Sequence, residues 1–163
     1  MRIIGIDPGL SGGIAILEDN KIKQIFDMPV MSDGKKNKRQ LNSAFLAQLI
    51  KDNIKDIEDT VMVVEQVNAM PGQGVTSMFN FGQTFGAIKG ICAALGLPIF
   101  FVRPAKWKKH FELINSSKDA SRTKAIEMYP SLAEKLSKKK DVNKSDAILI
   151  ARFYSETRLI DNN

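Results

Sequence analysis

The sequence predicts an α/β fold in which a five-stranded mixed sheet is flanked by helices. Two observations carry this prediction. Three strand-like segments open the chain, and strands alternate with helical segments after them. The apolar run at residues 61–64 is continuous and rich in valine, which is typical of a parallel strand covered on both sides. Three antiparallel strands followed by such an alternation favour one sheet with helices on both faces.

Each element has a local reason. Asp19 and Asn20 favour a hairpin turn between the second and third strands, and Gly96 followed by Pro98 ends a long helix. In chain order we expect strands at residues 2–7, 12–18 and 21–28, a helix at 42–53, a strand ending at Glu65, a helix at 77–95, a strand at 99–102, a short helix holding Trp107, a helix from about Lys118 and a last helix from about Lys144.

Residues 32–39 are polar and rich in lysine, and they predict a mobile loop between the third strand and the first helix. Such a loop is a candidate contact for phosphate. A solvated loop is the alternative, and the sequence leaves both open.

Length and composition fit one globular domain over residues 1–163, because a chain of 163 residues with 44% hydrophobic content can bury a sufficient core. The net charge of +6 and the pI near 9.4 favour a polyanionic partner. No apolar stretch is long enough to span a bilayer and no charged leader precedes the first strand, so we expect a cytoplasmic protein with no membrane partner. One cysteine, Cys92, and one histidine, His110, exclude a zinc or thiol–imidazole site within one chain.

Three acidic residues occupy positions where a metal-binding carboxylate is expected. Asp7 ends the first strand before a tight glycine turn, and Glu65 closes the apolar run. If these strands are parallel neighbours about 4.8 Å apart, the two side chains can share a cation. Asp146 lies on the inward stripe of the last helix. Singly, each acid has an ordinary explanation, as a turn residue or as a favourable charge in a first helical turn, but together they indicate a site.

The element order is that of the ribonuclease H-like fold. In open α/β sheets the site lies at the carboxyl ends of the parallel strands, where the chain order reverses, and Asp7 and Glu65 fall there.

The chain resembles the RuvC family of Holliday-junction resolvases over nearly its whole length. Residues 74–90 are similar to phage-type and organellar members of that family. The likeness is carried, in order, by Gly5-Ile6-Asp7-Pro8-Gly9, by Glu65-Gln66-Val67 and by Lys144-Ser145-Asp146-Ala147-Ile148-Leu149-Ile150-Ala151.

The resemblance implies a crossover junction endodeoxyribonuclease, a homodimer that binds a four-way DNA junction and makes paired symmetrical nicks with divalent-metal help. It assigns catalysis and metal binding to Asp7, Glu65 and Asp146, with a fourth ligand just ahead of the last helix. Family members place Asp or His three residues before the final Asp, where this chain has Asn143, whereas Asp141 lies five residues before it. We expect Asp141 to be the fourth ligand, with Asn143 as the alternative.

The acids also indicate which metal to expect. Several carboxylates at one point repel one another unless cations neutralise them, and hard oxygen ligands favour Mg²⁺ or Mn²⁺ over Zn²⁺. Two such ions per site could activate a water and stabilise the leaving 3′ oxygen during in-line attack on a phosphodiester.

A basic stretch follows the fifth strand, on the predicted active edge of the sheet. The resemblance strengthens Lys108 and Lys118 as phosphate contacts, and ordinary surface lysines are the alternative. The candidate DNA-binding residues are Lys106, Lys108, Lys109, Lys118 and Arg122.

Family members often carry an aromatic residue three positions after the catalytic Glu, but this chain has Asn68 there, and Met70 or Phe79 could take that role. A broader branch or flap nuclease of the same fold, and a branched-DNA-binding protein without catalysis, are the alternative functions.

The long helix carries a stripe of small residues. Gly82, Gly86 and Gly90 repeat every four residues and share one face, so another backbone can approach them closely. That face is either the dimer interface or a close contact with the chain's own sheet.

Overall fold

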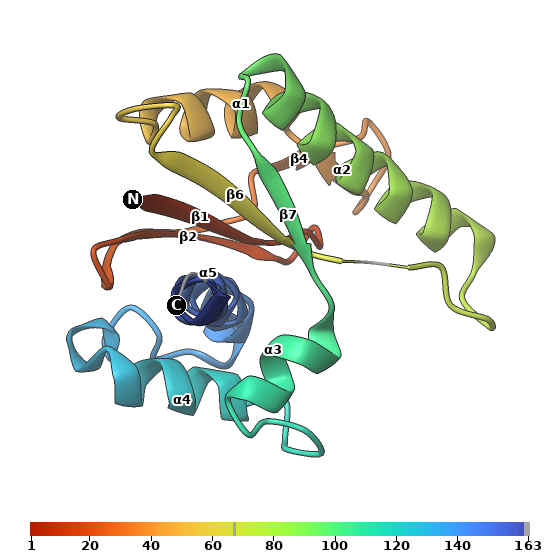
Figure 1. Cartoon of the computed structure of the whole chain (residues 1–163). Coiled ribbons are helices and arrows are strands. Elements are labelled where there is room, and N and C mark those ends of the chain that lie inside the picture. Colours follow the sequence, from red (N-terminus) through yellow and green to blue (C-terminus); the bar gives the residue numbers. More distant parts are fainter. Residues whose placement is uncertain (67, 162–163) are drawn as a thin grey trace.

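A computed structural model describes residues 1–66 and 68–161, and a five-stranded sheet forms its centre (Figure 1). The strands are β1 (Arg2–Asp7), β2 (Gly13–Glu18), β3 (Lys21–Asp27), β6 (Thr60–Glu65) and β7 (Ile99–Val102). Their order across the sheet is β3-β2-β1-β6-β7. The β1–β2 and β2–β3 pairs are antiparallel, and β1–β6 and β6–β7 are parallel, which confirms the predicted mixed sheet.

Helices cover both faces of this sheet. One group of helices lies on each face, as Figure 1 shows. The first pair is α1 (Ser43–Asp52) and α2 (Val75–Ala94), and the second group is α3 (Pro104–His110), α4 (Ala120–Met128) and α5 (Val142–Asp161), with short 3₁₀ turns at Pro130–Leu132 and Lys139–Asp141.

The alternation of side chains along the strands divides the core in two. Ile4 and Ile6 of β1 pack with buried residues of α1 and α2. Ile3 of β1 and Val63 of β6 pack on the other face, against α3 and α5. Cys92 of α2 is buried in the first of these clusters, as expected for a core residue.

Two glycines let α5 lie close against the sheet. A Cβ atom on Gly5 would come within 2.4 Å of the Ala147 carbonyl oxygen, and one on Gly13 within 2.7 Å of the Lys144 Cα. Any larger residue at these positions would push the first turns of α5 away. The glycines of the opening motif therefore determine how closely Asp146 approaches β1.

The predicted mobile loop at residues 32–39 is wrong in part, because the segment forms a hairpin. Its strands are β4 (Val30–Ser32) and β5 (Arg39–Leu41), which pair antiparallel from Val30–Leu41 to Ser32–Arg39. Leu41 is buried and joins the core shared with α1 and α2, and this contact anchors the base of the hairpin.

None of the helices in the described ranges combines the length and apolar character needed to cross a membrane.

Candidate active site

Asp7 and Glu65 lie side by side at the carboxyl ends of the central strands. Ile6 and Val64 form the last aligned pair of the parallel β1–β6 ladder, and the two acids follow directly. Gly5 faces Ala147 of α5, so Asp7, two residues further, points to the same side of the sheet. Glu65 likewise lies on the face that carries α3 and α5.

Asp146 approaches these strand ends from α5. The helix crosses β1 and β2 where Gly5 and Gly13 admit its backbone, and this places the first turns of α5 next to the acids. The Ser121 hydroxyl, buried at the start of α4, hydrogen-bonds the Asp146 carboxylate. Two helices thus cooperate to hold one acid.

The pKa values show that the three carboxylates interact electrostatically. Burial, followed by repulsion from Asp7 and Asp146, raises the pKa of Glu65 to about 7. Burial and the charge of Asp7 raise the pKa of Asp146 to about 6. Burial also raises the pKa of Asp7, against a hydrogen bond in which the Gly9 backbone N–H donates to its Oδ1 at 3.3 Å. A site with this much unscreened negative charge favours a bound cation.

α3 contributes two neighbouring residues to the site. The fully buried Trp107 donates from Nε1 to Oε1 of Glu65 at 3.3 Å. The positive charge of Lys108 lowers the pKa of Asp7, Glu65 and Asp146. Its Nζ also lies 5.3 Å from the centre of the Trp107 ring. The sequence placed Lys108 among DNA-binding candidates but gave no sign that Trp107 holds a carboxylate.

The donor set fits a hard cation, since it consists of carboxylates at one sheet edge. Within residues 1–66 and 68–161, no three or more Asp, Glu, His or Cys side chains are arranged so that they could hold a metal ion as they stand. The three acids therefore form an electrostatically coupled group and not a closed ligand cluster. Water or substrate oxygens would have to complete the coordination.

Asp141, the expected fourth ligand, has contacts of its own at the start of α5, and its role as a ligand stays a prediction. Its carboxylate accepts from the Lys138 backbone N–H at 2.8 Å and pairs with Lys144 at 2.9 Å. Burial alone would raise the pKa of Asp141. These two contacts and the charge of nearby Lys140 outweigh burial and lower that pKa. Asp141 thus caps a 3₁₀ turn and fixes the start of α5.

Asn143, the alternative, lines the same cavity as Asp146. This cavity has a volume of about 340 Å³ and lies between α3, α4 and the start of α5. The Asn143 Nδ2 donates to the Ser11 carbonyl oxygen at 2.5 Å, in the turn that follows Asp7. Asn143 therefore bridges the two segments that carry Asp7 and Asp146.

The basic candidates separate into three kinds. Lys108 and Lys118 line the cavity that holds Asp146. Lys106 and Lys109 are exposed on α3. Arg122 is occupied within the chain: its guanidinium donates to both Asp119 carboxylate oxygens, at 2.7 and 2.8 Å, and to the Leu136 carbonyl at 3.0 Å. The expectation that Arg122 binds DNA stays a prediction, and these contacts already engage its Nε and both terminal nitrogens.

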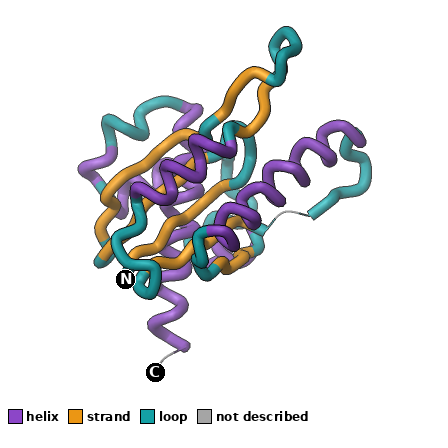
Figure 2. Tube along the Cα trace, turned by 90° about the horizontal axis from the view of Figure 1, so that it is seen from above, coloured by secondary structure: helices purple, strands orange, loops and turns teal. Residues whose placement is uncertain are grey.

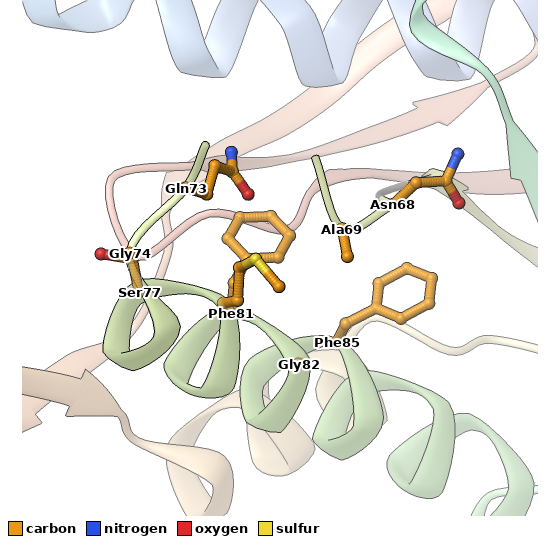
Figure 3. Close-up of a pocket in the computed structure, with 9 residues that line it drawn as sticks. Asn68, Ala69, Gln73, Gly74, Ser77, Phe81, Gly82 and Phe85 are labelled. Carbon is orange, nitrogen blue, oxygen red and sulfur yellow. The ribbon is translucent and has the colours of Figure 1, made fainter. Parts of the chain in front are cut away.

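An apolar cleft lies between the segment after Glu65 and α2. It has a volume of about 440 Å³, and Asn68 lines it together with Phe81 and Phe85 of α2 (Figure 3). Met70 and Phe79, the two candidates for the missing aromatic, are 59% and 64% exposed. Neither is held in a fixed position by the core.

Comparison with known proteins supports the fold. No family model matches the chain, and no curated protein matches it in sequence. A structure of RuvC from Thermus thermophilus is similar over 97% of both chains, with 17% identity and a TM-score of 0.56. A structure of T. thermophilus RuvC in complex with Holliday junction substrate is similar over 96% of both chains, with 16% identity and a TM-score of 0.58. The chain thus has the ribonuclease H-like fold of RuvC.

Proposed function

We propose that this chain is a metal-dependent endodeoxyribonuclease that resolves four-way DNA junctions by paired symmetrical nicks. The observation that carries the proposal is the meeting of Asp7, Glu65 and Asp146 around Lys108 at the strand ends. The fold adds support, because one similar structure is RuvC in complex with Holliday junction substrate. The RuvC-like motifs in the sequence contain the same three acids.

Asp7, Glu65 and Asp146 would hold Mg²⁺, or Mn²⁺ in its place, with two ions per site. When bound, these ions would supply an activated water and stabilise the leaving oxygen of the phosphodiester. The side-chain oxygen of Asn143 is the further donor that the geometry favours, since Asn143 lines the cavity of Asp146.

The other residues of the site have roles that follow from their contacts. Trp107 orients the Glu65 carboxylate through its indole N–H. Lys108 offsets the negative charge of the acids and, with Lys118, offers cations to a phosphate in the cavity beside Asp146. Lys106 and Lys109 extend this basic surface along α3 toward the flanking DNA.

We place the interface of a homodimer on α2. None of the described residues fills the space above Gly82, Gly86 and Gly90, and Val75 and Phe79 on the same helix are 84% and 64% exposed. A second copy of α2 could approach this face closely and cover the apolar side chains. Paired nicks need two sites, and two copies would supply them.

The test uses labelled synthetic four-way junctions beside flaps and linear duplexes, with Mg²⁺ or with EDTA. We expect paired symmetrical nicks on the junction, lost in EDTA and in Asp7→Asn, while Asp7→Asn still binds the junction. The matched control is Glu134→Gln, which neutralises an exposed acid outside the site.

Cleavage by Asp7→Asn at the parent rate would overturn the assignment of the site. Equal cutting of flaps would replace the junction resolvase with a broader branch nuclease. Binding without cutting by the parent protein would leave a branched-DNA-binding protein without catalysis.

A further inference from the structure

The β4–β5 hairpin stands out from the body of the molecule. In Figure 2 it is the pair of short strands joined by a loop that extends beyond the helices. Its tip is an ordered turn: the Asp33 N–H donates to the Lys38 carbonyl at 3.2 Å, and the Lys38 N–H donates to the Lys35 carbonyl at 3.2 Å. The hairpin therefore presents its side chains on a defined scaffold.

The tip carries concentrated positive charge. Lys35, Lys36, Lys38 and Arg39 lie within five residues and are all exposed. In the described part of the chain none of them forms an ion pair, whereas Lys55 on another surface pairs with Glu18 at 3.1 Å. The one acid of the tip, Asp33, uses Oδ1 to accept from the Lys35 backbone N–H at 2.9 Å. Such a group of unpaired cations suits a polyanion.

The Ser32–Arg39 end of the hairpin ladder, next to the tip, contacts the edge of the sheet that carries the acids. The Arg39 Nη2 donates to the Ser11 Oγ at 3.4 Å. Ser11 lies in the turn after Asp7, and its carbonyl accepts from Asn143. A polar cavity of about 260 Å³, lined by Arg39, Gln40 and residues of α2, follows the hairpin along this edge. The turn at residues 33–38 directly adjoins Arg39, and Asp33 within it lines the same cavity.

We propose that the β4–β5 hairpin binds the phosphate backbone of a duplex DNA arm next to the cleavage site. This inference rests on the proposed function and extends its binding surface to a segment that the acids and the α3 lysines do not include. The contact is electrostatic and independent of sequence, because the charged side chains that the tip offers are mainly lysines, which bind phosphates. It contributes affinity for long arms and takes no part in the chemistry.

The experiment measures junction binding as a function of salt in the Asp7→Asn background, with EDTA, so that no cutting occurs. The hairpin variant combines Lys35→Gln, Lys36→Gln and Lys38→Gln. The matched control removes equal charge at the opposite end of the sheet, with Lys21→Gln, Lys51→Gln and Lys55→Gln. Each protein is tested on junctions with long arms and on junctions whose arms end about three base pairs from the branch.

We expect the hairpin variant to lose about tenfold or more in affinity for long arms at low salt, and the log–log salt slope to flatten by about two to three. The control variant should keep the salt slope of the unmodified protein. Both variants should bind short-armed junctions with equal affinity. An unchanged slope in a folded hairpin variant would overturn the inference, as would an equal loss in the control. Failure of the unmodified protein to bind junctions at all would instead contradict the proposed function.

Discussion

Trp107 is fully buried, and the one polar atom of its side chain donates to a carboxylate of the candidate site. The indole ring packs among apolar residues of β1, β6 and α5, and this packing fixes the direction of the N–H group. The donor therefore stays aimed at Glu65 without losing side-chain freedom when a ligand binds. Trp107 is a positioning residue for a carboxylate that would otherwise be held only by the strand end.

Replacing Trp107 with Phe tests this role. We expect Trp107→Phe to lower Mn²⁺ affinity and the cleavage rate several-fold. The acidic midpoint of the pH–rate profile should move upward, because the hydrogen bond from Trp107 holds the pKa of Glu65 down and the variant lacks it. Stability should fall by about 1–3 kcal/mol. Calorimetric titration with Mn²⁺ and a pH series measure these effects.

The matched control is Phe111→Leu, in the same apolar cluster. It should lose comparable stability and keep Mn²⁺ affinity and the pH midpoint. A Trp107→Phe protein that behaves like this control would show that Trp107 only fills space.

The raised pKa values predict how stability depends on pH when no metal is bound. Folding raises the pKa of Glu65 from 4.5 to about 7 and that of Asp146 from 3.8 to about 6. The folded state thus binds more protons than the unfolded state in this range, so the free energy of unfolding falls as pH rises from about 4 to about 7. The Glu65 shift corresponds to on the order of 3 kcal/mol.

Glu65→Gln removes one of the two titrations and keeps an oxygen that can accept from Trp107. In EDTA we expect the free energy of unfolding of this variant to fall less steeply with rising pH, and to exceed that of the parent protein above pH 7. The Glu134→Gln control should keep the pH dependence of the parent protein. Urea unfolding at several pH values measures the slope. A parent protein whose stability is flat between pH 4 and pH 7 would contradict the buried, mutually repelling carboxylates.

At the level of elements, apolar composition was enough where a strand is buried on both faces of the sheet. The runs that became β1, β2 and β6 are almost wholly buried, so their apolar composition leaves little alternative. The β4–β5 hairpin escaped prediction because each strand has three residues and most of its side chains are exposed. A pairing that short has no hydrophobic pattern to read, and its lysine-rich tip has the composition of a loop.

The candidate site likewise contains features that the sequence could predict and features that depend on tertiary packing. Asp7 and Glu65 could be predicted because parallel strands bring their carboxyl ends to one edge. The Trp107–Glu65 contact could not, since it joins residues 42 positions apart through the packing of α3. Asn143 and Asp146 line one cavity because residues three apart share a helix face, whereas the choice between Asn143 and Asp141 as fourth ligand stays a prediction.

At the scale of the whole molecule, α2 leaves one face uncovered. Among the described residues, no atom outside the adjacent backbone of α2 itself lies within 4 Å of the positions that a Cβ would take on Gly82, Gly86 and Gly90. This stripe therefore does not pack closely on the described sheet, and the dimer interface stays a prediction. The exposed Val75 and Phe79 extend the same helix surface with apolar side chains.

Gly86→Leu tests whether a second copy covers this face. The leucine would enter open space within one chain, and it raises helix propensity by about 1 kcal/mol, so the isolated fold should be as stable as the parent or more so. Between two closely packed helices it would clash. We therefore expect a folded monomer where the parent protein is a dimer, measured by light scattering and thermal unfolding, with Ala44→Leu on the exposed side of α1 as the control.

The same variant connects assembly to chemistry. A monomer retains Asp7, Glu65 and Asp146, so Gly86→Leu should still nick one strand of a junction, but the two nicks should no longer occur together within the lifetime of one complex. Cruciform plasmid DNA distinguishes these products, since paired nicks linearise it and single nicks relax it. A dimeric Gly86→Leu protein, or a parent protein that is monomeric when bound to the junction, would contradict the α2 interface, because either result separates paired cutting from this surface.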